Sequence, residues 1–256
     1  MGAEKTVKDF KDHFSEKAAA YTRYRPTYPP ALFAWLAGLT ARHDLAWDCG
    51  CGNGQAAIGL APYFRQVIGT DPSRQQIENA VAHERIRYAV ASAEESGLDS
   101  ASVDLVVVAQ ALHWFDFERF YAEVRRAVRP GGVLAAISYG EVRVAGSADR
   151  IISRFYHEMI GPCWPPERRY VDDGYTTIPF PFPEVTAPPF AMEAEWTLEH
   201  LIGYLGTWSA VKEYERVTGD NPLALISEEL TEAWGDPLQQ RRVCWPLALR
   251  VGRVGE

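Results

Sequence analysis

The sequence predicts an α/β fold built on a doubly wound, mostly parallel sheet. Short apolar segments alternate with single helices over the first half of the chain, which places successive strands in parallel with helices on both faces. Residues 103–109 (VDLVVVA) form a continuous apolar run, typical of a strand that is buried on both faces. Residues 48–54 form a glycine-rich turn after the first strand, as expected for a strand that leads directly into a helix.

Seven segments have the length and apolar character of strands, so the sheet is expected to be seven-stranded. These strands are expected at residues 44–48, 66–71, 85–91, 103–109, 131–138, 190–196 and 243–251. The helices are expected at residues 55–64, 73–84, 117–128, 148–160, 197–210 and 222–234. Ser73 with Gln76 predicts a capped helix start, Asp116 predicts another, and Pro30 suits the first turn of an earlier helix.

We expect the 256 residues to form one domain with four parts. They are an N-terminal helical lid (1–43), a ligand-binding core (44–139), a cap insertion (140–190) and a C-terminal part of the sheet with helices (191–256). Prolines and aromatic residues are dense in residues 161–190, which excludes a central strand or a long helix there. This segment is interpreted as an ordered cap over a pocket, the alternative being a surface excursion whose aromatic residues pack locally.

The composition excludes several classes of protein. The formal net charge of −8 disfavours a nucleic-acid partner, because the chain would repel a phosphate backbone. No run of about 18 apolar residues is present, so no membrane partner is expected. Four cysteines without a Cys-x-x-Cys pair indicate neither a metal site nor a disulfide framework, and they fit a cytoplasmic protein.

The turn Asp48-Cys49-Gly50-Cys51-Gly52-Asn53-Gly54 carries the most specific chemical signal. A dinucleotide fingerprint has the spacing G-x-G-x-x-G, whereas these glycines fall as G-x-G-x-G. The turn is therefore expected to hold a nucleotide without a pyrophosphate. Its backbone would contact the carboxylate and polar groups of that ligand near a helix N-terminus.

Asp71 ends the second strand, 21 residues after Gly50. A carboxylate at this distance from the turn is placed to accept hydrogen bonds from both ribose hydroxyls. Pro72 would offer an apolar surface to the adenine. The alternative is an Asp-Pro turn that only starts a helix; the glycine turn at the matching distance favours ribose binding.

Together these motifs resemble the class I S-adenosylmethionine-dependent methyltransferases, which have a Rossmann-like fold. Within that family the chain is most similar to the group around trans-aconitate methyltransferase, whose members act on small molecules and often on carboxyl groups. The resemblance rests on the D-x-G-x-G-x-G turn, Asp71, Ala93-Glu94, the block VDLVVVAQALHWFD (103–116), the opening residues 21–29 and GYLGTWSAVKEY (203–214). It covers residues 20–140 densely and the tail loosely.

The resemblance implies S-adenosylmethionine as cofactor and a role for each matching residue. The residues that would surround the methionine part are Asp48, Cys49, Gly50, Gly52 and Gly54, while Asp71 would hold the ribose. Ser92, Ala93 and Glu94 would lie by the adenine, with Ser92 standing where many relatives have Asp. Gln110 and Ala111 would face the sulfonium. Tyr21 and Arg25 would fold over the cofactor as a lid, unless Arg25 makes a surface salt bridge.

On the acceptor side, His113 is either a catalytic base, a hydrogen-bond donor to the acceptor or a structural residue before Asp116. The residues expected as pocket walls, or alternatively as core, are Trp114, Tyr139, Trp164 and Trp208. Arg168 and Arg169 could pair with an anionic substrate or stay solvated. The leading hypothesis is O-methylation of a small-molecule carboxylate. The alternatives are an RNA or protein methyltransferase and a non-catalytic S-adenosylmethionine-binding protein.

Overall fold

The computed structural model describes residues 24–255, which divide into two compact units. The sheet unit comprises residues 27–140, 166–192 and 245–255. The helical unit comprises residues 24–26, 141–165 and 193–244. This division differs from the four consecutive parts expected from the sequence, because each unit is assembled from segments far apart in the chain.

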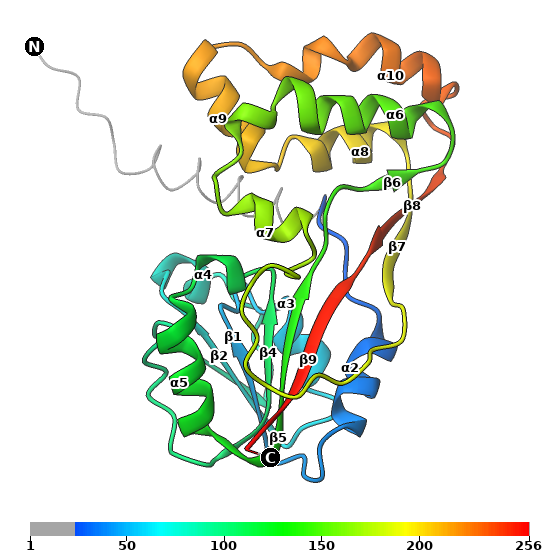
Figure 1. The fold of residues 1–256 in the computed structure, drawn as a ribbon. Coiled ribbons are helices and arrows are strands. Elements are labelled where there is room, and N and C mark those ends of the chain that lie inside the picture. Colours follow the sequence, from blue (N-terminus) through cyan, green and yellow to red (C-terminus); the bar gives the residue numbers. More distant parts are fainter. Residues whose placement is uncertain (1–23, 256) are drawn as a thin grey trace, which may run out of the picture. The chain divides into compact units, whose positions relative to one another are not determined.

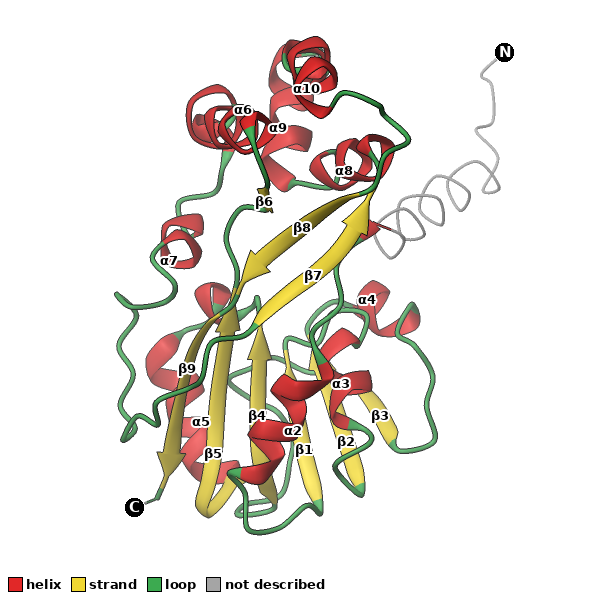
Figure 2. Ribbon diagram, turned by 90° about the vertical axis from the view of Figure 1, so that its right-hand side faces the viewer, coloured by secondary structure: helices red, strands yellow, loops and turns green. Residues whose placement is uncertain are grey.

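The sheet unit is built on a six-stranded sheet with the order β3-β2-β1-β4-β5-β9 (Figure 2). Its strands are β1 (Leu45–Cys49), β2 (Gln66–Asp71), β3 (Ile86–Val90), β4 (Val103–Ala109), β5 (Val128–Ser138) and β9 (Ala248–Val254). Only β9 runs antiparallel to its neighbour, β5. The predicted α/β class with a mostly parallel sheet is therefore confirmed.

The main sheet has six strands rather than seven, because the strand expected at residues 190–196 belongs to a second, three-stranded sheet with the order β6-β8-β7. Its strands are β6 (Arg143–Val144), β7 (Ala191–Trp196) and β8 (Arg241–Pro246). The predicted strand 243–251 is divided between β8 and β9, and the break follows Pro246. Proline lacks the backbone N–H that a continuous ladder needs, which explains a break at this point.

The helices, which are labelled in Figure 1, begin closer to their predicted starts than they end to their predicted ends. The sheet unit contains α2 (Pro30–Gly38), α3 (Gln55–Leu60), α4 (Arg74–Glu78), the 3-10 turn η1 (Leu112–Trp114), α5 (Phe117–Ala127) and α7 (Arg168–Asp172). The Ser73 hydroxyl caps α4 at the Gln76 amide (3.3 Å), and Asp116 caps α5 at the Arg119 amide (3.2 Å). Both caps confirm the sequence prediction.

The helical unit contains more and shorter helices than expected. They are α6 (Ser147–Arg154), the π-helix η2 (Phe155–Met159), η3 (Gly161–Cys163), α8 (Leu198–Leu205), α9 (Ser209–Thr218), η4 (Pro222–Leu225) and α10 (Ser227–Trp234). The predicted helix 197–210 ends at Leu205, and a new helix begins at Ser209. No helix in the described part of the chain is both long and apolar enough to cross a membrane.

The two faces of the main sheet pack against different helices. On β4, Val106 and Val108 face the cluster that includes Phe120 and Val124 of α5. The alternate residues of β4 and β5 face the other cluster, to which the strands contribute Leu105, Val107, Val133 and Ala135. The helices α2 and α3 contribute Leu32, Leu36, Ala57 and Leu60 to this cluster. This alternation follows from the two-residue period of a strand and buries β4 on both faces, as its apolar run predicts.

The strand order reverses between β1 and β4, because β1 leads outward through β2 to β3 and the chain then returns to the other side of β1. In open parallel sheets, ligands bind beyond the carboxyl ends of the strands at such a reversal. Cys49, Asp71 and Ala109 end β1, β2 and β4 at this edge. The predicted glycine turn therefore lies where the topology places a binding site.

The part of the Pro-rich segment that belongs to the sheet unit is well packed. Val171, Tyr175 and Phe182 are buried in the same cluster as α5. The Tyr121 hydroxyl of α5 donates a hydrogen bond to the carbonyl of Pro179 at 2.6 Å. Four side chains, those of Val171, Tyr175, Ile178 and Phe182, thus anchor residues 171–182 in the core of this unit. The role of this segment as a cap stays a prediction.

Candidate active site

Asp48 lies next to the end of β1 with its side chain fully buried. Its Oδ2 accepts a hydrogen bond from the Ala57 amide of α3 at 2.8 Å, while Oδ1 has no partner among the described residues. Burial raises the pKa of this carboxyl to about 7, against the Ala57 bond, and the nearby charge of Asp71 raises it further. A buried carboxylate oxygen without a partner is costly, and a donor group on a ligand would relieve that cost.

The glycine turn is anchored to β2 and leaves room above Gly52. The amides of Gly50 and Cys51 both donate to the Thr70 carbonyl, at 2.8 and 2.9 Å. Gly52 has a φ of +53°, and the nearest described atom to a Cβ built there is 3.9 Å away. Gly54, with a φ of +89°, has the opposite surroundings, because a Cβ there would lie 2.1 Å from the Tyr88 hydroxyl. Gly52 is thus the position where a ligand can approach the backbone.

Asp71 connects the turn to the start of α4. Its Oδ2 accepts the Gly52 amide at 2.9 Å, and its Oδ1 accepts the Ser73 amide at 2.8 Å. Each carboxylate oxygen has two lone-pair directions, so one on each oxygen remains for another donor. The two interpretations of Asp71 are therefore compatible: the side chain starts a helix and retains acceptor capacity for two ribose hydroxyls. Pro72 beside it is exposed.

The predicted adenine segment follows β3. Ala93 is buried, and Ser92 and Glu94 are half-buried. Glu94 Oε1 accepts a hydrogen bond from the Asp116 amide at 3.0 Å, which ties this loop to the start of α5. Glu94 is thus already used structurally through one oxygen, so an adenine contact by this side chain would need its other oxygen.

Gln110 and Ala111 follow β4, and Ala111 lies directly beside the glycine turn. The Ala111 Cβ is 2.6 Å from the position that a Cβ on Gly50 would take, so the two turns are in close contact. Gln110 has a φ of +58°, which is uncommon for a residue other than glycine, and its Nε2 donates to the Tyr139 carbonyl at 2.6 Å. Tyr139 is buried, with its ring edge against Tyr28.

His113 lies in η1 and is 8% exposed. Its Nδ1 lies 2.9 Å from the hydroxyl oxygen of Tyr175. Burial lowers the pKa of His113 to about 4, and the positive charge of Arg168 acts in the same direction. Arg168 begins α7, which packs against η1.

Tyr175 is the site residue that sequence reasoning missed. It is fully buried, lies 62 residues from His113 and has a φ of +63°. The only signal for it in the sequence is the preceding Gly174, in a segment rich in turn-forming residues. Nothing in that signal points to His113.

The other predicted residues are distributed over both units. Trp114 of the sheet unit is 58% exposed, and Cys49 is buried in the sheet. Trp164 and Trp208 belong to the helical unit, where their ring centroids lie 5.8 Å apart and both contact Tyr156. In the same unit the Arg25 guanidinium lies 5.5 Å from the centre of the Tyr204 ring. Tyr21 lies outside the described residues.

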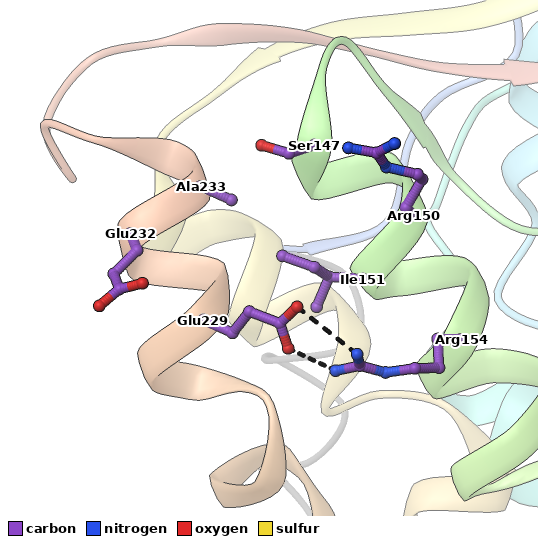
Figure 3. Close-up of a pocket in the computed structure, with 7 residues that line it drawn as sticks. All are labelled: Ser147, Arg150, Ile151, Arg154, Glu229, Glu232 and Ala233. Carbon is purple, nitrogen blue, oxygen red and sulfur yellow. Dashed lines mark hydrogen bonds and ion pairs between the residues drawn. The ribbon is translucent and has the colours of Figure 1, made fainter.

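The helical unit has an open pocket of its own, between α6 and α10 (Figure 3). An ion pair between Arg154 and Glu229 crosses it, and Arg150 and Glu232 add charges of both signs. None of the residues predicted for the site lines this pocket. Within residues 24–255, no group of three His, Cys, Asp or Glu side chains is arranged to hold a metal ion.

Comparisons with known proteins agree with this geometry. Residues 47–136 match the family model described as "Methyltransferase domain". A Dictyostelium discoideum protein named "Putative methyltransferase" is 36% identical over 233 residues, which cover 90% of this chain and 89% of the relative. A Mycobacterium tuberculosis protein named "Uncharacterized methyltransferase" is 35% identical over 74% of this chain and 72% of its own length.

A solved structure extends the likeness to nearly the whole fold. The protein, described as a "Putative Type II Methyltransferase" from Anaeromyxobacter dehalogenans, is 51% identical, with a TM-score of 0.86 over 90% of this chain and 98% of its own. The residues of the sheet unit also fit S-adenosylmethionine: the space at Gly52 admits a ligand, and the buried Asp48 Oδ1 can accept a donor. The chain belongs to the class I S-adenosylmethionine-dependent methyltransferases.

Proposed function

We propose that this methyltransferase acts on a small molecule and methylates one of its carboxylate oxygens. When bound, S-adenosylmethionine supplies a methyl group that is already activated by the positive sulfur. In the proposed transfer, a carboxylate oxygen of the acceptor would take up that methyl group, with one C–O bond formed and one C–S bond broken. The products are an ester and a thioether, and no proton has to be removed. The task of the protein is to align the reactants and exclude water.

The surroundings of His113 carry this proposal. His113 is the titratable side chain predicted on the acceptor side, and burial holds its pKa at about 4. A base of that strength is poorly matched to the proton of a phenol, an alcohol or an ammonium group at neutral pH. Its Nδ1 is also engaged with Tyr175. A carboxylate is ionised at neutral pH and needs no such base, so this acceptor fits the site best.

A positive charge near His113 supports an anionic acceptor. The charge of Arg168 reaches both His113 and Tyr175. The Arg168 side chain is 20% exposed, and its guanidinium lies 3.4 Å from Asp172, one turn later on α7. A largely desolvated guanidinium is a strong recognition group for carboxylates. We also propose that the chain belongs with the trans-aconitate methyltransferase group, as the resemblance in its sequence implies.

The roles of individual residues belong to this proposal too. Asp48, the glycine turn and Asp71 would hold the methionine and ribose parts of the cofactor, with Ala93 and Glu94 at the adenine. Gln110 and Ala111 would face the reacting groups. The residues proposed as walls of the acceptor pocket are Trp114, Tyr139, Trp164 and Trp208. Arg25 is proposed as part of a lid over the cofactor, and residues 140–190 are proposed as a cap.

A screen of acceptors tests the proposal. The purified protein is incubated with S-adenosylmethionine and with polycarboxylates, fatty acids or phenols, and release of S-adenosylhomocysteine is measured. Each active acid is paired with its carboxamide, which has a similar shape without the charge. We expect turnover with carboxylic acids and none with the carboxamides. Turnover confined to phenols, or to added RNA or protein, would refute the carboxylate assignment.

A further inference from the structure

Tyr175 is held in an uncommon backbone conformation by several independent contacts. Its amide donates to the Tyr170 carbonyl at 2.7 Å, at the end of α7. Arg250 of β9 donates from one guanidinium nitrogen to the carbonyls of Tyr175 (3.0 Å) and Ile178 (2.6 Å), and it also pairs with Glu184. A positive φ is sterically unfavourable for a tyrosine and persists only where the surroundings fix it. Such over-determined positions gather at functional sites.

The Tyr175 hydroxyl has its acceptor and donor roles set by its neighbours. Burial raises its pKa well above the ordinary value. The phenol therefore keeps its proton at neutral pH. His113 Nδ1, at 2.9 Å, is the one hydrogen-bond partner of this buried hydroxyl among the described residues. The hydroxyl proton is therefore directed to Nδ1, because a buried O–H without an acceptor would be costly.

This hydrogen bond decides which nitrogen of His113 carries the proton. A neutral imidazole has one donor and one acceptor nitrogen. If Nδ1 accepts from Tyr175, the ring proton must be on Nε2. A second ring proton on Nδ1 would face the tyrosine hydroxyl and the nearby charge of Arg168. Nε2 itself has no hydrogen-bond partner among residues 24–255, so it is left to serve a ligand.

We infer that Tyr175 is a positioning residue for the reaction proposed above: it fixes His113 as a neutral ring with its proton on Nε2, and that N–H donates a hydrogen bond to the acceptor carboxylate. The inference rests on the proposed function for the identity of the acceptor. It assigns to His113 the orientation of the acceptor and not the removal of a proton. It also gives the buried hydroxyl of Tyr175 a role beyond packing.

Steady-state kinetics with four variants test this role. Loss of one hydrogen bond of about 1 kcal/mol predicts that Tyr175→Phe raises the KM for the acid about fivefold, with kcat within about twofold. Tyr121→Phe is the matched control: it removes another buried hydroxyl that holds the same segment, through Pro179, but does not contact His113. We expect its KM to stay unchanged.

The nature of the substitution at His113 separates a donor from a base. His113→Gln keeps an N–H group near the position of Nε2, whereas His113→Leu keeps the bulk alone. We expect the Gln variant to retain most of the affinity for the acid and the Leu variant to lose it, with kcat preserved in both. Equal and large losses of kcat in both variants would show that His113 removes a proton, and would overturn the inference.

The tautomer can be observed without any acceptor. Two-bond ¹H–¹⁵N spectra of histidine-labelled protein at pH 7 distinguish Nε2–H, Nδ1–H and doubly protonated rings, and the signals missing from His113→Gln identify His113. We expect Nε2–H in the wild type and a mixture in Tyr175→Phe. An Nδ1–H or cationic ring at His113 in the wild type would overturn the inference, whatever the kinetics of the variants. A failure of the proposed function would appear in the acceptor screen instead and leave this spectrum unchanged.

Discussion

The turn after β1 and the turn after β4 lie in contact, yet they are built in different ways. The first is defined by nearby sequence: Gly52 is tied to Asp71 only 19 residues away, and its glycines have the positive φ angles that the turn needs. The second depends on His113, whose partner Tyr175 lies 62 residues away. The turn proposed to hold the cofactor is thus encoded locally, whereas the turn proposed to face the acceptor is completed by a distant segment.

Asp71→Ala should have the largest effect, because it removes both a ribose acceptor and the bond that shapes the turn at Gly52. Hydrogen bonds to a charged group contribute about 1.5–3 kcal/mol each, so we expect affinity for S-adenosylhomocysteine to fall roughly 100-fold or more. Isothermal titration calorimetry measures this, with the exposed Asp99→Ala as control. Unchanged affinity in Asp71→Ala would remove the basis for the cofactor assignment.

The turn after β4 makes its own prediction about acid stability. The folded pKa of His113, about 4, lies below the ordinary value of 6.5, so the unfolded chain binds this proton more readily. The contribution of the neutral His113 ring to the free energy of unfolding is therefore fully present above pH 6.5 and is lost as the pH falls towards 4. As the pH is lowered from 7.5 to 5, the free energy of unfolding of His113→Gln should therefore rise by about 2 kcal/mol relative to that of the wild type.

Urea unfolding at several pH values measures that difference. The two curves of unfolding free energy against pH should converge or cross on the acid side, because only the wild type pays for protonating a buried ring. Parallel curves would mean that the pKa of His113 is the same in the folded and unfolded chain, and would contradict the proposal that His113 does not act as a base.

Gly52→Ala tests whether the space at the first turn serves a ligand. Both Gly52 and Gly97 have positive φ, and neither meets a described atom closer than 3.9 Å when a Cβ is added. Each alanine variant should lose about 1 kcal/mol of stability from the same backbone strain. Only Gly52→Ala should also weaken cofactor binding, by about tenfold, a loss of about 1.4 kcal/mol. Equal affinities in the two variants would count against a ligand at Gly52.

The smallest effect is expected where the loop after β3 is fastened to α5. The amide and hydroxyl of Ser96 both donate to Glu123, which also pairs with Arg126. The Arg126 hydrogen bonds, with help from Ser96, lower the pKa of Glu123 to about 2 against the effect of burial. Ser96→Ala removes one of these bonds and should cost about 1 kcal/mol in urea unfolding, more than Ser102→Ala in the turn before β4. Equal costs would mean that this contact contributes little.

The sequence predicted features that depend on a few neighbouring residues. The caps at Ser73 and Asp116 and the β4 strand were of this kind. Each follows from spacing along one strand, one helix or one strand–helix turn.

What could not be predicted depends on partners that are distant in the chain. The run 243–251 could not reveal that it divides after Pro246 between two sheets, since strand pairing is decided by residues far away. The two units are likewise assembled from separate segments. Tyr175 was missed because its hydrogen-bond partners, Arg250 at the carbonyl and His113 at the hydroxyl, both lie far away in the chain.

In the proposed reaction, a sulfonium-bound methyl group passes to the carboxylate of a small molecule held at these two turns. The most direct test uses S-adenosylmethionine with a trideuterated methyl group and the carboxylic acids found active in the screen, followed by mass spectrometry before and after mild alkali. We expect a trideuteromethyl ester that alkali cleaves to the original acid. A label that survives alkali, or that appears on RNA or protein, would contradict it.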